Sequence, residues 1–318
     1  GPLKGEMKNW PKVNIYLCKR PFDDDVLVKG FDTILTFLLY HKEIEYHVYM
    51  EETVKNHSVA VAHHNSPRLH FFQDRIMNSF DINYVFTLGG DGTILWAHKM
   101  FNTLSLPPFL CFNGGTLCFL SNFDIKNAET TLSFFHTKVK SKFTFNYKIF
   151  PRLDSYVCGP DSCERYKKYM LNDVVVERTT PNIIALDIYI NDCLAVSVKS
   201  DGLLISSSTG STAYNLSLAN GVIMHSDVES IIINPMASMS LSSRPIIVPK
   251  NYKVKVVFSE KSRNDSRLVY DGVNSCSFSK GDSLTIESCS EGLSMILKDD
   301  HNETASWIHK LRELRGWK

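Results

Sequence analysis

The sequence lacks any apolar run close to the roughly 20 residues that a membrane span requires, and it lacks a strong excess of charge. It has 35 basic and 34 acidic residues and a formal net charge of +1. Such a balance gives no strong electrostatic attraction to nucleic acid or to an anionic membrane. We therefore expect no nucleic-acid partner and no membrane association.

The cysteines do not form the pattern of a disulfide framework or of a structural zinc site. The eight cysteines are scattered, and the one close pair, Cys158 and Cys163, has no matching second pair. Several others lie in apolar runs, where a free thiol behaves as a small hydrophobe. We expect reduced thiols and a cytoplasmic location. Residues 1–6 resemble a protease-cleavage remnant before Met7 and are set aside here, which leaves open a targeting segment removed upstream.

What is present is the composition of an ordinary globular protein. Hydrophobic residues make up 43% of the chain and charged residues 22%. A length of 318 residues predicts about two domains, each with its own core.

One stretch, residues 83–95, joins a predicted strand to a predicted helix through Gly89-Gly90-Asp91-Gly92. The apolar run 84–88 is typical of a buried strand, and residues 93–101 of a helix. Glycines let backbone N–H groups approach a phosphate, and a helix start favours anions. Four such residues could equally be a tight turn, but the strand before and the helix after favour a phosphate site. Asp91 would then act as a base toward a hydroxyl or as a partner of Mg²⁺.

Strands and helices alternate through the first part of the chain, which predicts a parallel sheet covered by helices. The segments are strands over 13–17, 45–49, 84–88 and 108–112, and helices over 24–41, 93–101 and 128–136. Residues 51–68 are polar and rich in histidine, and we expect a loop with solvated histidines there rather than a metal site.

From residue 142 the side chains alternate between apolar and polar, and strand patterns dominate as far as residue 297. This half predicts a β-sandwich, with a polar excursion at 154–168 and a hairpin turn at Asn191-Asp192. An amphipathic helix over 304–314 is expected to return to the first domain. The predicted domains are an α/β domain over 8–140, completed by 299–318, and a β-sandwich over 141–298.

Two segments of the second half have unusual polar residues. Asn172-Asp173 precedes three valines, where an amide and a carboxylate could bind a base edge and sugar hydroxyls. Alone, this pair would more simply cap the strand. The second segment, 199–217, runs from a strand into a Ser/Thr/Gly turn and a helix start, where hydroxyl residues could cap the helix or leave room for a base beside Tyr214.

Taken together, these motifs resemble those of the NAD kinase family over most of residues 13–317. The matching segments are Gly89-Gly90-Asp91-Gly92-Thr93, Gly115-Thr116-Leu117-Cys118-Phe119-Leu120, Leu171-Asn172-Asp173-Val174-Val175, Ser200-Asp201-Gly202, Thr209-Gly210-Ser211-Thr212-Ala213-Tyr214 and Ser243-Arg244-Pro245-Ile246-Ile247-Val248-Pro249. Gly-Gly-Asp-Gly also occurs in diacylglycerol-type lipid kinases, whereas the Thr-Gly-Ser-Thr-Ala-Tyr run is far more specific.

The resemblance implies phosphoryl transfer from ATP to the 2′-hydroxyl of the adenosine ribose of NAD, with the site in the cleft between the domains. Asp91 would be catalytic, and Gly89, Gly90, Gly92 and Thr93 would bind phosphate. The implied NAD-binding residues are Phe119, Asn172, Asp173, Asp201, Thr209, Thr212, Ala213, Tyr214 and Ser217. Mg²⁺ or Mn²⁺ would be held mainly by phosphates and not by protein side chains, and the assembly would be a homodimer or homotetramer.

The chain departs from the family pattern at three of these positions. Asp173 replaces the usual glutamate, Ser200 a glycine and Cys118 another glycine. The charged groups of the family pattern are retained at these motifs, so we expect the three changes to alter substrate affinity or tolerance for NADH and not to abolish activity. Two other functions stay open: a lipid kinase, and a catalytically silent NADP(H)-binding module. The sequence leaves the donor (ATP or polyphosphate) and the acceptor (NAD or NADH) undecided.

Overall fold

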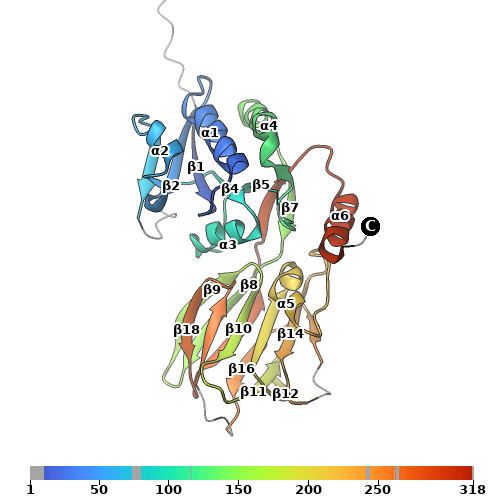
Figure 1. Cartoon of the computed structure of the whole chain (residues 1–318). Helices are drawn as coiled ribbons and strands as arrows, with labels where there is room; N and C mark the ends of the chain where they lie inside the picture. Colours follow the sequence, from blue (N-terminus) through green and yellow to red (C-terminus); the bar gives the residue numbers. More distant parts are fainter. Residues whose placement is uncertain are drawn as a thin grey trace, which may run out of the picture. The chain divides into compact units, whose positions relative to one another are not determined.

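A computed structural model of the chain describes residues 11–73, 80–115, 117–240, 244–260, 262 and 265–316. Thr116 and Ser243, which belong to two of the motifs above, lie outside the described residues. The chain divides into two compact units (Figure 1). Unit 1 comprises residues 1–101, 106–148 and 294–318, and unit 2 comprises residues 102–105 and 149–293.

Unit 1 is an α/β domain built on a largely parallel sheet of eight strands. The strand order is β3-β2-β1-β4-β5-β20-β7, and β6 pairs with β5. The strands are β1 (Lys12–Lys19), β2 (Glu45–Glu51), β3 (Leu69–Phe72), β4 (Tyr84–Gly89), β5 (Phe109–Asn113), β6 (Phe123–Asp124), β7 (Asn146–Phe150) and β20 (Leu293–Leu297). Pairs among β1 to β6 are parallel, as expected when helices connect successive strands.

The helices of unit 1 are α1 (Asp25–Leu39), α2 (Ser58–Ala62), α3 (Asp91–Lys99), α4 (Ala128–Lys140) and α6 (Glu303–Arg315), with short 3₁₀ turns η1 (Glu52–Val54) and η3 (Ile125–Asn127). Helices α1 to α4 bury apolar residues, whereas the described residues of α6 are half-buried or exposed. Phe31 and Leu35 of α1 and Leu132 of α4 share one core with Ile15 and Leu17 of β1. The opposite side of β1 faces α3, where Cys18 Sγ donates to the Thr93 carbonyl.

Unit 2 is a sandwich of two antiparallel sheets, as the sequence pattern predicts. The sheets have the orders β15-β14-β13-β10-β17-β18 and β12-β11-β16-β19-β8-β9. Their strands are β8 (Leu153–Gly159), β9 (Ser162–Met170), β10 (Asp173–Arg178), β11 (Ile184–Ile190), β12 (Cys193–Ser200), β13 (Gly202–Ser207), β14 (Ser230–Met236), β15 (Ile246–Pro249), β16 (Val254–Phe258), β17 (Ser266–Tyr270), β18 (Asn274–Phe278) and β19 (Ser283–Ser288). Val174, Leu203 and Ile231 of the first sheet and Leu186 and Val256 of the second share the core.

Several local expectations are corrected by the structure. Residues 154–168 form most of the β8–β9 hairpin and not an excursion, and 51–68 contain η1 and α2. The strand expected from residue 142 begins at Asn146 and joins the sheet of unit 1, as does β20. The units therefore meet along the chain at 148/149 and 293/294, whereas the sequence places these borders at 140/141 and 298/299. Pairing partners far along the chain decide sheet membership, and alternation alone does not identify them.

Two local predictions are confirmed. The Asn191-Asp192 turn joins β11 to β12, and both residues have positive φ, 49° and 66°, as a two-residue hairpin requires. The C-terminal amphipathic helix is α6, and it belongs to unit 1. In the described part of the chain, every helix is too short or too polar to span a membrane.

Candidate functional site

The Gly-Gly-Asp-Gly turn lies where β4, a buried strand between β1 and β5, passes into α3. Gly89 has a φ of 153°, and a Cβ there would lie 2.2 Å from Thr93 Oγ1. Glycine is therefore needed at this position for both conformation and space. Gly90 is the N-cap of α3 and Asp91 is its first residue. The carboxylate consequently lies at the positive end of the helix dipole.

The Asp91 carboxylate is held by residues 118–120. Cys118 Sγ donates to Oδ1 at 2.7 Å, Leu120 N donates to Oδ1 at 3.1 Å, and Phe119 N donates to Oδ2 at 3.0 Å. Burial raises the pKa of the Cys118 thiol, and the charge of Asp91 raises it further, so the thiol stays protonated and donates. The structure thus joins the two glycine motifs of unit 1, and the cysteine that departs from the family pattern takes part in the junction.

A cavity of about 700 Å³ opens beside this turn within unit 1. Gly90, Gly92 and Thr93 line it, together with residues that the sequence reasoning missed: Lys19, Arg20, Glu51, His57 and Trp96. Trp96 Nε1 donates to Glu51 at 2.9 Å. Lys19 is paired with Asp23 at 2.6 Å, and Arg20 is paired with Asp24. The sequence did contain a signal for this cavity. Lys19 and Arg20 stand at the end of β1, and β1 and β4 end at the same edge of a parallel sheet, so these basic residues could be expected beside the glycine turn.

The C-terminal helix reaches the same loop through a half-buried cation, Lys310. Lys310 Nζ donates to the Phe119 carbonyl at 2.9 Å and to Asn122 Oδ1 at 3.1 Å. Burial lowers the pKa of Lys310, and the nearby Cys118 and Asp91 oppose that shift. Lys310 and Leu117 also line a second cavity of unit 1, about 420 Å³ in volume. Sequence reasoning missed Lys310, because only the fold brings α6 to this loop.

NAD is the substrate that the family resemblance implies, and on that expectation Lys310→Met should raise the KM for NAD about tenfold while leaving kcat closer to the wild-type value. Methionine keeps the buried stem but removes the charged donor, and a hydrogen bond to a charged group contributes about 1.5–3 kcal/mol. Phe119 would then lose the contact that fixes its carbonyl. Steady-state kinetics tests this, with Arg312→Met on an exposed turn of the same helix as the matched control. Equal KM values for the two variants would exclude a positioning role for Lys310.

In unit 2, Asn172 and Asp173 lie in a buried turn held by a residue that the sequence reasoning missed. The Asp271 carboxylate accepts from the backbone N–H groups of Leu171 at 2.9 Å, Asn172 at 2.7 Å and Asp173 at 3.0 Å. Asp173 is 3% exposed, and burial together with the charge of Asp271 raises its pKa well above the usual range. In the described part of the chain its carboxylate has no hydrogen-bond donor. A buried carboxylate without a donor is suited to accept hydrogen bonds from the hydroxyl groups of a ligand.

The Thr-Gly-Ser-Thr-Ala-Tyr run packs against this turn. It follows β13 as a 3₁₀ turn, η4 (Thr209–Thr212), and a short helical turn, α5 (Tyr214–Ser217). A Cβ at Gly210 would lie 2.4 Å from the Asn172 carbonyl oxygen, so glycine allows the close approach. Thr209 is buried and donates to the Pro151 carbonyl at 3.1 Å. Thr212 and Ala213 are half-buried, and Tyr214 and Ser217 are exposed.

Asn215 anchors this run through side-chain hydrogen bonds. Its Nδ2 donates to the Ser211 carbonyl at 3.1 Å and to the Val222 carbonyl at 3.0 Å, and its Oδ1 accepts from Asn234 at 3.0 Å. Asn215 is fully buried. In the sequence Asn215 is simply the residue after Tyr214. Its anchoring role depends on Asn234 of β14, which only the fold brings beside it. The hydroxyl and aromatic side chains of the run are therefore presented by a rigid support.

Asp201 is not brought together with the other predicted residues of unit 2. It precedes β13, whereas Thr209 follows it, so the two are separated by the length of the strand, roughly 20 Å. Arg178 Nε lies 3.3 Å from Asp201 Oδ1 at that far end. The predicted contact of Asp201 with NAD stays a prediction.

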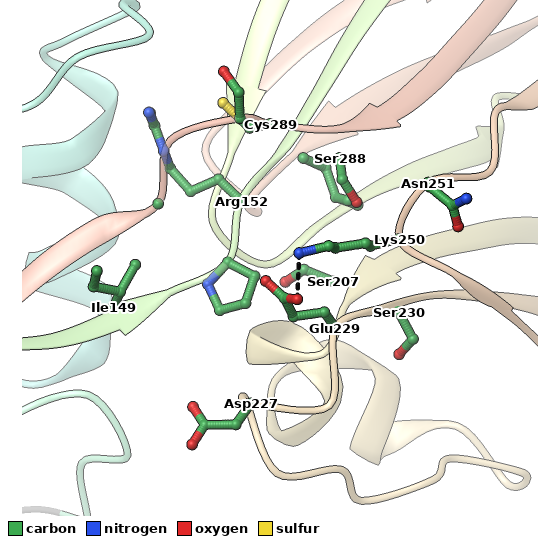
Figure 2. Close-up of a pocket in the computed structure, with 14 residues that line it drawn as sticks. Ile149, Arg152, Ser207, Asp227, Glu229, Ser230, Lys250, Asn251, Ser288 and Cys289 are labelled. Atoms are coloured by element: carbon green, nitrogen blue, oxygen red, sulfur yellow. Dashed lines mark hydrogen bonds and ion pairs between the residues drawn. The ribbon is translucent and has the colours of Figure 1, made fainter.

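A further cavity of unit 2, about 600 Å³, opens between the ends of the two sheets (Figure 2). Ser207, Ser230 and Ser288 line it, and Lys250 forms an ion pair with Glu229 across it. The buried Arg152 also lines it, and its guanidinium donates to the carbonyl groups of Thr103, Leu104 and Glu291. None of the predicted NAD-binding residues lines this cavity.

A glycine-turn carboxylate on an α/β sheet, combined with an antiparallel sandwich bearing Asn-Asp and Thr-Gly-Ser-Thr-Ala-Tyr, defines a class of two-domain kinases. Residues 25–138 match the ATP-NAD kinase N-terminal domain, and residues 171–297 match the ATP-NAD kinase C-terminal domain. The chain belongs to the NAD kinase family.

Relatives and solved structures agree with this assignment. The chain is 35% identical over 237 residues to the NAD kinase of Azotobacter vinelandii, covering 73% of this chain and 75% of that protein. It is 34% identical over 219 residues to an ATP-NADH kinase of Saccharomyces cerevisiae, covering 65% of this chain and 43% of that protein. The crystal structure of yeast NADH kinase complexed with NADH superposes with a TM-score of 0.81 at 26% identity, covering 98% of this chain and 89% of that one.

An NAD kinase from Archaeoglobus fulgidus, solved in complex with ATP, shares the fold, with a TM-score of 0.66 at 19% identity over 96% of this chain and 98% of that one. The chain spans 43% and 59% of the lengths of two curated relatives, the ATP-NADH kinase of S. cerevisiae and a mitochondrial NADH kinase of Schizosaccharomyces pombe.

Proposed function

We propose that this protein transfers the γ-phosphoryl group of ATP to the 2′-hydroxyl of the adenosine ribose of NAD or NADH. The observation that carries the proposal is the Asp91 carboxylate, which begins α3 after a glycine turn and is oriented by Cys118, Phe119 and Leu120. An alcohol is a poor nucleophile at neutral pH. A fixed carboxylate can orient the hydroxyl and accept its proton as the new bond to phosphorus forms.

The phosphates of the donor would bind at the Gly-Gly-Asp-Gly turn. Gly89, Gly90, Gly92 and Thr93 surround the start of α3, where N–H groups and the helix dipole favour negative charge. The adjoining cavity of about 700 Å³ offers Lys19 and Arg20 at its wall. Interactions of this kind hold phosphates in line and stabilise charge in the transition state.

Divalent metal would enter with the donor as MgATP, or with Mn²⁺ in its place. The Asp91 oxygens already accept three protein hydrogen bonds, and the Glu51 oxygens accept from Trp96. The described residues that line the cavity thus supply no open carboxylate cluster, which suits a metal ion carried by phosphate oxygens. When bound, the ion would neutralise phosphate charge.

The dinucleotide would be recognised mainly by unit 2. Asn172 and Asp173 would bind base and ribose hydroxyls, Tyr214 would offer a stacking face, and Thr209, Thr212, Ala213 and Ser217 would line the pocket. Phe119 in unit 1 would pack on adenine. Asp173 is buried without a hydrogen-bond donor, which supports this assignment, because the hydroxyl groups of a ligand can donate the hydrogen bonds that the described residues do not.

The experiment that tests the proposal measures product formation from each donor and acceptor. Purified protein with MgATP and NAD should yield NADP, detected by coupling to an NADP-specific dehydrogenase. NADH and polyphosphate are tested in parallel arms, with NADPH measured directly by chromatography. Absence of phosphorylated dinucleotide in every arm, from protein that still binds NADP in calorimetry, would support the silent binding module instead.

A cytoplasmic location and a homodimeric or homotetrameric assembly belong to the same proposal, and the assembly is tested by light scattering.

A further inference from the structure

Two imidazoles and a carboxylate meet on unit 1 away from the residues proposed for catalysis. His41 and Glu43 lie in the connection between α1 and β2, and His136 lies on α4. Their ligand atoms all lie within 4.8 Å of one another. We call these three residues the His-Glu-His cluster. It is the one group of three such side chains with this spacing among the described residues.

The donor set is one that proteins use for zinc. Two histidines and one glutamate, with a fourth position for water, form a common zinc site, with ligand bonds of about 2.0–2.2 Å. Ligand atoms around a tetrahedral ion are then about 3.3 Å apart. His136 Nε2 already lies 2.9 Å from Glu43 Oε2, and the two imidazole rings are 3.9 Å apart between centroids. The three side chains therefore already gather around one point, and the two imidazole rings would have to move apart for both to bind the same ion.

Hydrogen bonds at Nδ1 orient both histidine rings. The buried Tyr46 hydroxyl lies 3.0 Å from His136 Nδ1, and the Glu43 backbone N–H donates to His41 Nδ1 at 3.2 Å. His136 can therefore donate Nδ1–H to Tyr46 and keep Nε2 for a ligand, the arrangement expected of a metal-binding histidine. His41 would bind the ion through Nδ1, whose lone pair accepts the Glu43 N–H in the metal-free protein.

Positive charges also face the cluster and would oppose a cation. Lys140 Nζ lies 2.6 Å from Glu43 Oε1, and Arg68 acts on His41 over a longer range. Lys140 is 54% exposed at its side chain, so it can turn into solvent when Oε1 is needed by an ion. The Glu43 side chain is 44% exposed, which leaves a path for the ion to enter.

We propose that His41, Glu43 and His136 form a binding site for a single Zn²⁺ ion, completed by water. The ion would join the α1–β2 connection to α4, two segments separated by more than 90 residues in sequence. It would stabilise unit 1 without touching the substrates, because a ligand that binds only the folded state shifts the folding equilibrium.

The test compares zinc binding by the wild type, the double variant His41→Asn/His136→Asn and Tyr46→Phe, with His309→Asn on exposed α6 as the control. Calorimetric titration with ZnCl₂ should show one fewer ion bound by the double variant and normal binding by the control. Tyr46→Phe keeps the buried ring but loses the hydroxyl that orients His136, so its zinc affinity should fall about 10–100-fold. Zinc should raise the Tm of the wild type and of His309→Asn, but not that of the double variant.

A Co²⁺ titration separates this site from the thiols, because thiolate ligands add charge-transfer bands that a site with nitrogen and oxygen ligands lacks. Visible d–d bands without those charge-transfer bands, absent from the double variant, would support the proposal. Equal zinc stoichiometry and affinity in the wild type and in a folded double variant would overturn it. Loss of binding in the double variant, with Tyr46→Phe unchanged, would overturn the role assigned to Tyr46.

Discussion

Asp91→Asn should lower kcat by about 10²-fold or more, as expected when a general base is removed. The affinity for NAD should stay nearly unchanged, because the carboxylate acts on the reacting hydroxyl and not on the rest of the dinucleotide. The measurements are kcat in the coupled assay and the NAD dissociation constant by calorimetry. Near-normal turnover in the variant would remove Asp91 from the chemistry.

The structure also shows how a purely structural role of Asp91 would differ. Its oxygens accept from Cys118, Phe119 and Leu120, and an amide can accept at only one of its two ends. If the carboxylate merely holds this segment, Asp91→Asn should lower the Tm and the NAD affinity together while kcat at saturating NAD persists. Cys118→Ser is the matched control, because a hydroxyl still donates to Oδ1, and its kcat should stay close to the wild-type value.

Asp271→Ala should be the most destabilising single change in unit 2. It removes the acceptor for three N–H groups in the buried turn at residues 171–173, and an unsatisfied buried donor costs about 1–3 kcal/mol. Asp271 also has a φ of 48°, a conformation that alanine disfavours. We expect the free energy of unfolding of unit 2 to fall by about 3 kcal/mol or more, and the KM for NAD to rise. Scanning calorimetry and kinetics test the two effects, and an unchanged transition would contradict the anchoring role.

The isosteric variant Asp271→Asn isolates the charge and predicts a pH dependence. Burial raises the pKa of Asp271 to about 6 from 3.8, against the opposing effect of the three N–H groups. Between those pH values the folded state keeps a proton that the unfolded state has released. This favourable contribution is therefore complete below about pH 4 and is lost as the pH rises through 6.

Asparagine has no such titration. From pH 4 to 7, the free energy of unfolding of the wild type should thus fall relative to Asp271→Asn by on the order of 2–3 kcal/mol. Denaturant titrations at several pH values measure the difference. A difference that stays flat across this range would mean that Asp271 titrates at its ordinary pKa.

The sequence by itself determined the elements whose signals are local. The apolar run before Gly89 and the helix after it predicted β4 and α3, since strand and helix periodicity and glycine backbone freedom act over a few residues. Asn191-Asp192 predicted its hairpin for the same reason. The alternation of elements predicted the α/β and sandwich architectures, and the motifs predicted the family. Asn172 and Thr209 could be named as site residues, although the close approach of Gly210 to the Asn172 carbonyl could not.

Only the tertiary structure decided which distant segments complete these sites. β7 and β20 join the sheet of unit 1 because strand pairing is chosen by partners far along the chain. Lys310 binds the Phe119 loop across 191 positions, and Asp271 supports Asn172 across 99. A single lysine or aspartate carries no periodicity, so sequence patterns cannot mark it. Burial and long-range hydrogen bonding give these residues their roles, and both exist only once the chain has folded.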